Sequence, residues 1–407
     1  MPGIREPREA LAALRRRADV RAVEELAKAT GQPVRLVGGA VRDAFLRRRG
    51  ADLDVSLPAG RAEAFANALA KRLGVRAVLL GPAGKRIHLV PFRRSDIEIW
   101  QEERDEEHDL LRRDFTVNAL SFELPSGRFA APPTALADLR RGRLALPRPG
   151  VFLEDPLRVL RAARFEGALP GFRVAALAEP ELREAARALG TVAAERKLEE
   201  LDRILALPPR TCAAQMRRLE TWGVLEAMLP GASAADRRRG LRRLARAPAS
   251  SGPAVRRALL LSPLGASGAL ETLEAWRVPR RELRLAGVLL RTPGRRPGCA
   301  PGRREVVEAL HALNPFLSEG VDYLSASRSP GLRRLAAALR GLRPAHTRRL
   351  LAPRRPITVD EVRELLQLRD GPELGRALRA LDVALASGEV RGKRQARELL
   401  RSVSGPC

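Results

Sequence analysis

The chain has 407 residues, enough for two to four domains and a sizeable core. Its net charge of +27 at pH 7 favours a polyanionic partner such as RNA, although an arginine-rich and alanine-rich composition is also what a GC-rich genome produces. Three isolated cysteines (Cys212, Cys299 and Cys407) exclude a disulfide framework and give no zinc-ligand spacing. No apolar run is long enough to span a membrane, and the N-terminus is not signal-like. A cytoplasmic location is therefore expected.

The hydrophobic pattern divides the chain into two kinds of region. Residues 5–30 predict one amphipathic helix. Residues 34–130 alternate short strand-like runs with helical segments, and beyond about residue 150 the strand signal fades into helical periodicity broken by Pro and Gly. The pattern therefore predicts an α/β head followed by an all-α body. The predicted strands are Arg35–Gly38, Asp52–Leu57, Arg76–Leu80, Ile87–Phe92 and Asp96–Trp100.

The first two of these strands carry the most informative residues. The first ends at Gly38-Gly39, where the bare backbone N–H groups of a tight turn can approach a phosphate. The second carries Asp52 and Asp54, whose carboxylates point to one face of a strand about 7 Å apart. Two such carboxylates can hold a pair of Mg²⁺ ions roughly 4 Å apart for in-line attack on phosphorus. The alternative for Asp-x-Asp alone is a solvated strand end, which the preceding Gly-Gly-x-Val-Arg-Asp run makes a poor interpretation.

The run from Arg35 to Asp54 resembles the signature of class II tRNA nucleotidyltransferases, the family of CCA-adding enzymes and bacterial poly(A) polymerases. The resemblance implies that Gly38, Gly39 and Arg42 cradle a nucleoside triphosphate and that Asp52 and Asp54 are catalytic ligands of Mg²⁺. In Asp96-Ile97-Glu98-Ile99, alternation puts Asp96 and Glu98 on one face. By position, Glu98 is the better candidate for a third catalytic, metal-binding carboxylate, and an edge-strand charge is the alternative.

A second motif runs from Leu111 to Leu120. Its paired arginines, Arg112 and Arg113, present planar forks that match phosphate oxygens. Asp114 and Asn118 would share one face of a helix. The alternative is an Arg–Asp pair that caps an ordinary helix. The segment resembles the family motif Arg-Arg-Asp-Phe-Thr-x-Asn-Ala, which implies that Arg113 contacts the triphosphate and Asp114 the ribose region, with Asn118 also in the nucleotide site.

A third motif begins at Glu154-Asp155-Pro156. Pro156 suits the first turn of a helix with Asp155 as its N-cap, and arginines then recur every three residues along one face. The alternative is a solvated helix with a charged face. The segment resembles the family's Glu-Asp-x-x-Arg motif followed by Leu-Arg-x-x-Arg-Phe. The resemblance implies that Asp155 and Arg158 read the Watson–Crick edge of CTP or ATP and that two further arginines, Arg161 and Arg164, reach the phosphates.

Weaker likenesses extend over most of the remaining chain. Glu195–Leu201 is close to the family's Glu-Arg-x-x-x-Glu-Leu, and the stretches 357–375 and 388–390 resemble the tail of the CCA-adding group. The fold implied is an α/β nucleotidyltransferase head, similar to the palm of polymerase β and built on a mixed β-sheet, followed by an all-α neck, body and tail. The expected parts are an N-terminal helix packing on the head (1–32), the head (33–148), a neck with the base template (149–210), a helical body (211–330) and a tRNA-binding tail (331–407).

The chain departs from the family pattern in two places. From Glu98 to Arg112 is only 112 − 98 = 14 residues. Full CCA-adding enzymes carry a longer segment there, with a flexible loop tied to the switch from CTP to ATP, and a short loop is associated with enzymes that add only CC. After Gly127, Phe129–Thr134 replaces the family's Asp-Pro-x-Gly-Gly turn. We expect a structural turn there, with altered local geometry and no loss of chemistry.

Together the motifs predict an Mg²⁺-dependent enzyme that adds CC or CCA to the tRNA 3′ end from CTP and ATP, without a nucleic-acid template, and releases pyrophosphate. Its basic helical faces would hold the acceptor and TΨC arms, and no membrane partner is expected. Three alternatives stay open. One is a poly(A) polymerase, to whose branch Gly84–Leu89 bears a faint likeness. The others are a catalytically silent RNA-binding protein, against which the intact Asp52 and Asp54 argue, and a small-molecule nucleotidyltransferase, which would have little use for the basic body.

Overall fold

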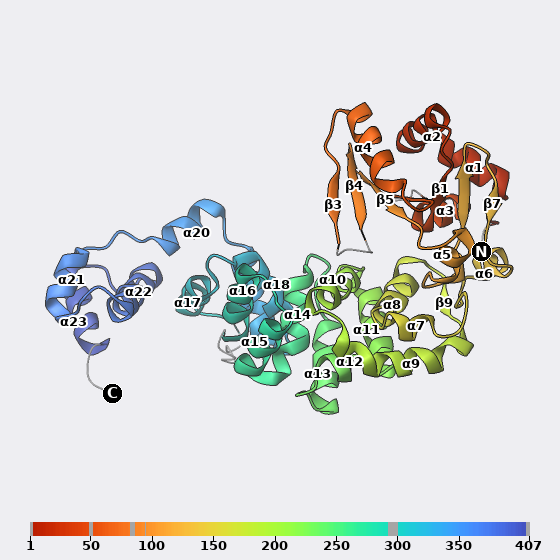
Figure 1. Ribbon diagram of the computed structural model, residues 1–407. Coiled ribbons are helices and arrows are strands. Elements are labelled where there is room, and N and C mark those ends of the chain that lie inside the picture. The colour runs from red at the N-terminus through yellow and green to blue at the C-terminus, as the bar shows by residue number, and fades with distance from the viewer. Residues whose placement is uncertain (1–2, 49–51, 82–85, 94, 292–299, 404–407) are drawn as a thin grey trace. The chain divides into compact units, whose positions relative to one another are not determined.

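The computed structural model describes residues 3–48, 52–81, 86–93, 95–291 and 300–403 (Figure 1). Cys299, Cys407 and the Gly84-Lys85 part of the poly(A)-like segment lie outside these ranges. The chain divides into two compact units, Met1–Val192 with Thr221–Ala227 and Ala193–Glu220 with Met228–Cys407. Every residue predicted for the site falls in the first unit.

The first unit contains all the strands of the described chain. They are β1 (Val34–Val37), β2 (Leu53–Leu57), β3 (Val78–Leu80), β4 (Ile87–Phe92), β5 (Ser95–Gln101), β6 (Ser121–Leu124), β7 (Phe129–Ala130), β8 (Arg143–Leu144) and β9 (Arg173–Val174). Seven form one mixed sheet in the order β3-β4-β5-β2-β1-β6-β7, in which only β2 and β5 pair in parallel. The other two, β8 and β9, pair in parallel as a separate small sheet.

Helices surround this sheet and lead away from it. They are α1 (Pro7–Arg15), α2 (Ala18–Thr30), α3 (Gly38–Phe45), α4 (Ala62–Leu73), α5 (Glu106–Leu111), α6 (Ala135–Arg141), α7 (Val151–Glu154), α8 (Arg158–Ala168), α9 (Glu179–Arg187) and α12 (Val224–Met228), with short 3₁₀ turns at Thr116–Asn118, Ala176–Ala178 and Ala188–Thr191. Of these, α3 and α4 pack on the sheet.

The two faces of the large sheet differ in character. Val55 of β2 and Ile97 and Ile99 of β5 are fully buried in the core, where each such side chain contributes about 1.5–3 kcal/mol. Because successive strand side chains alternate, Asp54 and Glu98, which are partners in the β2–β5 register, point to the opposite face. The fold therefore separates an apolar core face from a polar face that carries the predicted carboxylates.

Some local predictions from the sequence are wrong. Residues 5–30 form two helices, because Arg17 adopts an extended backbone as the N-cap of α2 and forms an ion pair with Asp19. Gly38 begins α3 instead of ending β1, and Asp52 precedes β2. The strand signal also does not end at residue 150, since β9 pairs with β8 but is too short to leave a periodic pattern.

The replaced segment after Gly127 forms a hairpin. Gly127 has φ +78°, and Phe129 and Ala130 pair with β6. Downstream, Asp138 of α6 is buried and accepts a hydrogen bond from Thr116 Oγ1 at 3.0 Å. These contacts give the segment a structural role, as the sequence predicts.

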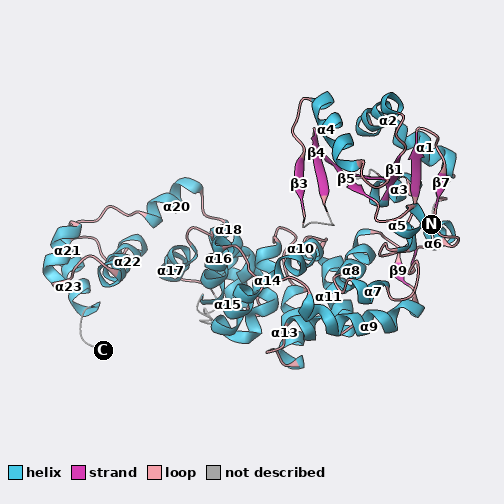
Figure 2. Ribbon diagram, in the orientation of Figure 1, coloured by secondary structure: helices cyan, strands magenta, loops and turns pink. Residues whose placement is uncertain are grey.

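The described residues of the second unit form helices joined by loops and contain no strand (Figure 2). Its helices are α10 (Ala194–Leu205), α11 (Pro209–Thr221), α13 (Ala234–Leu244), α14 (Pro253–Leu261), α15 (Gly265–Ala275), α16 (Arg280–Arg291), α17 (Arg303–Leu313), α18 (Leu317–Ser325), α19 (Pro330–Arg340), α20 (Pro344–Leu351), α21 (Val359–Leu366), α22 (Pro372–Ser387) and α23 (Lys393–Val403), with a 3₁₀ turn at Ser262–Leu264. One apolar core joins α14, α16, α17, α18, α19 and α20 with part of α22, and a second joins α21, α22 and α23. None of the helices in the described part of the chain combines the length and apolar character needed to cross a membrane.

Candidate active site

The turn between β1 and α3 brings three predicted residues into contact. Gly38 has φ +71°, a conformation that residues with a side chain rarely adopt. A Cβ added to Gly38 would lie 2.6 Å from Asp54 Oδ2 and 3.0 Å from Arg113 Nη1. The neighbouring Gly39 N–H donates a hydrogen bond to Asp54. Glycine at position 38 is therefore what lets a carboxylate and a guanidinium approach the same stretch of backbone.

The three predicted metal-binding carboxylates lie along β2 and β5. Asp54 and Glu98 are register partners, while Asp52 is exposed and its Oδ1 accepts a hydrogen bond from the Asp96 N–H at 3.2 Å. Burial raises the pKa of Asp54, and the positive charge of Arg113 opposes that rise. Among the described residues, no three or more His, Cys, Asp and Glu side chains gather closely enough to hold a metal ion by themselves.

Arg113 is held on both sides. Its Nη2 donates to Asp109 Oδ2 at 3.0 Å, and its guanidinium lies 5.6 Å from the centre of the Trp100 ring, close enough for a cation–π attraction. Its Nε is buried and makes no hydrogen bond within the described chain. A buried donor without a partner costs free energy, so Arg113 is poised to donate to an incoming anion.

Asp114 is the centre of a buried hydrogen-bond network. Its Oδ1 accepts from the Phe115 N–H at 2.9 Å and from Asn118 Nδ2 at 2.8 Å, while Arg161 Nε donates to Oδ2 at 2.9 Å. Burial alone would raise the pKa of Asp114, but the Arg161 charge and these hydrogen bonds lower it to about 2. Asp114 and Asn118 lie together, but a 3₁₀ turn at residues 116–118 brings them into contact rather than the predicted shared face of a helix.

The network continues into α3 and α8. Arg42 is buried, and its Nη1 donates to Asn118 Oδ1 at 2.7 Å. The guanidinium carbons of Arg42, Arg161 and Arg164 lie 5.4, 5.5 and 4.4 Å from the centre of the Phe165 ring. The buried Phe165 ring attracts all three guanidinium cations and so keeps these arginines together beside α8.

The predicted base-reading pair lies where α7 meets α8. Asp155 ends α7 rather than acting as the N-cap of α8, which starts at Arg158; its Oδ1 still accepts from the Leu157 N–H at 3.3 Å. Arg158 Nη1 donates to the Val151 carbonyl at 2.7 Å, and Nη2 donates to the Arg112 carbonyl at 2.5 Å. Burial lowers the pKa of Arg158, opposed by nearby carboxylates. Since a guanidinium has five N–H donors, this fixed fork can still donate to a base.

The sequence analysis missed two residues that shape the site. Trp100 could have been found, because alternation from Glu98 places it on the same face of β5. Asp109 could also have been found, because it lies four residues before Arg113, the spacing of helical ion pairs. Both signals are weak in a chain with 75 lysines and arginines, where most acidic residues have a basic neighbour at such spacings.

Paired carboxylates on a mixed sheet, next to a glycine turn and guanidiniums, are the arrangement of enzymes that transfer phosphoryl or nucleotidyl groups. Residues 34–145 match the family described as the Poly A polymerase head domain. The chain is 32% identical over 412 residues to the CC-adding tRNA nucleotidyltransferase of Thermus thermophilus, covering 89% of this chain and 92% of that protein. It is 30% identical to the CCA-adding enzyme of Geobacillus thermodenitrificans, covering 90% and 91%. The chain therefore belongs to the family of CCA- and CC-adding tRNA nucleotidyltransferases.

Other comparisons agree on the fold. The chain is 39% identical to the CC-adding enzyme of Synechocystis, a match that spans 42% of each protein. The Thermotoga maritima CCA-adding enzyme complexed with tRNA superposes with a TM-score of 0.68 over 99% of this chain and all of that one, at 19% identity. A CCA-adding enzyme complexed with ATP gives 0.70 over 99% and 100%, at 20% identity. Nucleotidyltransferases of this family generally use divalent metal ions.

Proposed function

We propose that this chain transfers cytidylates, and where the end is completed an adenylate, from CTP and ATP to the 3′ end of tRNA, with release of pyrophosphate in the cytoplasm. The relatives that cover most of the chain are named for this addition. The observation that carries the proposal is the shared contact of Gly38, Asp54 and Arg113. This contact supports a role for Asp54 in metal binding and for Arg113 in phosphate binding, because both lie at one glycine turn, where backbone N–H groups can meet a triphosphate.

Mg²⁺ is the proposed cofactor, held by Asp52, Asp54 and Glu98. Carboxylate oxygens suit this ion, which is commonly bound by one or two carboxylates together with substrate phosphates. This mode of coordination needs no group of three protein ligands, and the described residues provide none. When bound, the ion would lower the pKa of the tRNA 3′-hydroxyl and offset the charge of the leaving pyrophosphate.

The other predicted residues divide into three roles. Gly38 and Gly39 N–H groups, with Arg113, would bind the triphosphate, helped by the arginines around Phe165: Arg42, Arg161 and Arg164. Asp114 and Asn118 would meet the ribose. Asp155 and Arg158 would read the base edge, since a rigid acceptor and forked donor can discriminate bases. The predicted neck, body and tail would hold the acceptor and TΨC arms by shape and phosphate contacts.

The direct experiment uses a tRNA transcript that lacks CCA, incubated with Mg²⁺ and with CTP, ATP or both, and reads the 3′ ends by sequencing. The 13 residues between Glu98 and Arg112 leave no room for a long mobile loop, so we expect products that stop at CC even with ATP present. A complete CCA end would contradict only the expectation that addition stops at CC. Long A tails would show a poly(A) polymerase, and no product would overturn the function.

The carboxylate assignment is tested by Asp54→Asn and Asp52→Ala. Each should lower kcat for cytidine addition by at least about 10²-fold, because the variant would hold Mg²⁺ less well and lose the charge stabilisation that the ion would supply at the reacting phosphate. Binding of tRNA, measured by filter retention, should stay near that of the parent protein. Glu25→Gln, which breaks only the exposed Arg72–Glu25 ion pair, is the matched control. Turnover close to normal in either aspartate variant would contradict the assignment.

A further inference from the structure

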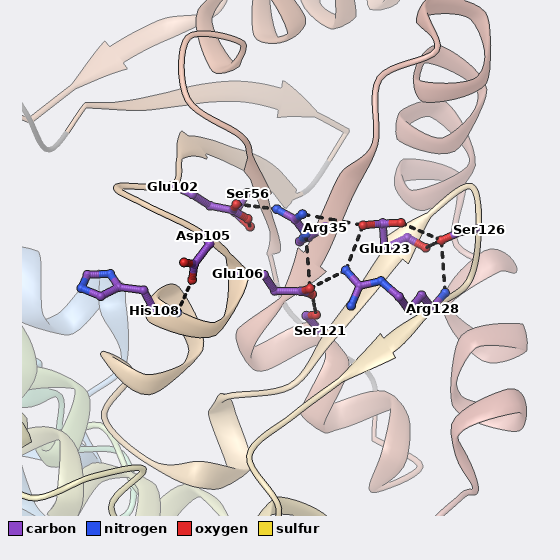
Figure 3. A network of polar contacts seen from close by, with 10 residues as sticks. All are labelled: Arg35, Ser56, Glu102, Asp105, Glu106, His108, Ser121, Glu123, Ser126 and Arg128. Atoms are coloured by element: carbon purple, nitrogen blue, oxygen red, sulfur yellow. Dashed lines mark hydrogen bonds and ion pairs between the residues drawn. The ribbon is translucent and has the colours of Figure 1, made fainter.

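Figure 3 shows a cluster of ion pairs that takes no part in the chemistry proposed above. It joins residues of β1, β2, β6, α5 and the segments next to β5 and β7. We call it the anchor cluster, and it consists of Arg35, Ser56, Glu102, Glu106, Ser121, Glu123 and Arg128.

The anchor cluster and the carboxylates share one face of the sheet. Arg35 is the register partner of Ser56 on β2 and of Glu123 on β6, so these three side chains point the same way. Ser56 lies two residues after Asp54, which puts it on the face of Asp54 and Glu98. The cluster is therefore a continuation of the site face along β2.

Glu102 ties the end of β5 to this face. Its N–H donates to the Leu57 carbonyl at 2.8 Å, and its Oε1 accepts from Ser56 Oγ at 2.9 Å. Its Oε2 forms a close ion pair with Arg35 Nη1, and the side chain is 2% exposed. A buried carboxylate with this many partners fixes the point at which the short segment after β5 begins.

Glu106 ties the other end of that segment. It is the first residue of α5, and it accepts close hydrogen bonds from Ser121 Oγ and Arg128 Nη2. Arg35 Nε lies 3.6 Å from Glu106 Oε2, and this buried nitrogen makes no hydrogen bond within the described chain. Glu106 therefore receives one hydroxyl and two guanidiniums from three different strands or turns of the head.

Only the rest of α5 and Arg112 separate Glu106 from Arg113. Asp105 caps this helix by accepting the His108 N–H at 2.8 Å, and Arg113 pairs with Asp109 inside its last turn. A short capped helix moves as one body, so a displacement of Glu106 is passed to Arg113. Arg113 in turn contacts the Gly38 turn and Asp54.

We propose that Glu106 is a positioning residue, which acts with Arg35 and Arg128 to hold the segment from Glu102 to Arg113 and so sets the place of Arg113 at the triphosphate. This inference rests on the proposed nucleotidyl transfer. The segment from Glu102 to Arg113 is then held in place at both ends. The affinity for CTP depends on charged side chains that do not contact CTP.

The test begins with Glu106→Gln, which keeps the shape of the side chain and removes its charge. The KM for CTP should rise about tenfold, as expected for weakening one charged hydrogen bond at the triphosphate. Arg128→Met, at a half-exposed site that tolerates truncation, should also raise the KM for CTP. Arg128→Lys should bring this KM most of the way back to the parent value. Glu25→Gln should change nothing. A KM for CTP that is unchanged in both cluster variants overturns the proposal.

A double-mutant cycle distinguishes positioning from loss of stability. In an Arg113→Gln background, Glu106→Gln should no longer raise the KM for CTP, because the group it positions is gone. An equal rise in both backgrounds overturns the proposal.

Hydrogen exchange provides a readout that does not depend on activity. The amides of α5 should exchange faster in Glu106→Gln than in the parent, and unchanged exchange would contradict the clamp. A parent protein that adds no nucleotide would refute the proposed function, while the exchange result would still decide whether the cluster holds the segment.

Discussion

At the scale of single residues, Asp114 shows how the site fixes its own charges. Both of its oxygens are used, one by Phe115 N–H and Asn118 and the other by Arg161. A buried carboxylate without such partners would be neutral or destabilising, whereas here the ionised form is favoured. Asp114 therefore positions Arg161 directly, and it positions Arg42 through Asn118.

The acid stability of the protein should report on this carboxylate. Its pKa in the folded protein is about 2, below the ordinary value of 3.8, so the unfolded chain takes up the proton first as the pH falls. The stabilisation is thus present above about pH 4 and is lost as the pH falls through about 2, in an amount of about 2 kcal/mol. Chemical unfolding between pH 6 and pH 2 should show this loss, and Asp114→Asn should remove it. Parallel pH profiles for Asp114→Asn and the Glu25→Gln control would contradict the assignment.

At the scale of elements, the turn from β1 into α3 is the most constrained part of the site. Gly38→Ala should abolish most activity, because the new Cβ would meet Asp54 Oδ2 at 2.6 Å. Gly31→Ala is the matched control, since Gly31 has a similar φ of +63° but has no atom within 4 Å of an added Cβ. Both variants should lose about 1 kcal/mol of stability from the backbone alone, and only Gly38→Ala should lose turnover. Steady-state kinetics and thermal unfolding separate the two effects, and equal activities would refute the steric argument.

Much of the site was predictable because its signals are local. Strand alternation places Asp54 with Glu98, and the short spacing of Asp114 and Asn118 keeps them near each other, although a 3₁₀ turn rather than a helix face provides their contact. What could not be predicted are contacts between distant segments, such as Arg42 with Asn118, 76 residues apart, and Arg35 with Glu102, 67 apart. In a chain with this many arginines each carboxylate has many possible partners, and only the three-dimensional register selects one.

The same reasoning explains the misplaced helix boundaries. The break between α1 and α2 depends on the extended backbone of Arg17 and its ion pair with Asp19, while the apolar spacing continues across it. The start of α8 after Asp155 likewise depends on α7, a four-residue helix too short to have a recognisable period. Boundaries fixed by single side chains leave little trace in a hydrophobic pattern.

At the scale of the whole molecule, composition alone does not reveal the cause of the excess positive charge. Codon usage and RNA binding would both produce a net charge of +27. The second unit gives the question a location, because one cavity of 870 Å³ there is lined by seven uncharged residues and by more arginines than glutamates. The charged residues are Arg281, Arg284, Arg291, Arg379, Glu274 and Glu319. The excess of arginine gives this mostly apolar lining a positive charge, which attracts a phosphate backbone.

Salt dependence separates the two explanations. If the charge serves tRNA, the KM for tRNA should rise at least about tenfold between 50 and 200 mM KCl at fixed Mg²⁺, because each neutralised phosphate releases counterions. The KM for CTP should rise much less, since CTP presents few phosphates. Arg281→Gln combined with Arg284→Gln should reduce the slope of log KM against log salt by about two if both arginines meet phosphates. Arg72→Gln, in the first unit, is the control and should leave it unchanged. A slope that stays the same in the double variant would show that these arginines do not meet tRNA phosphates and that their charge reflects composition.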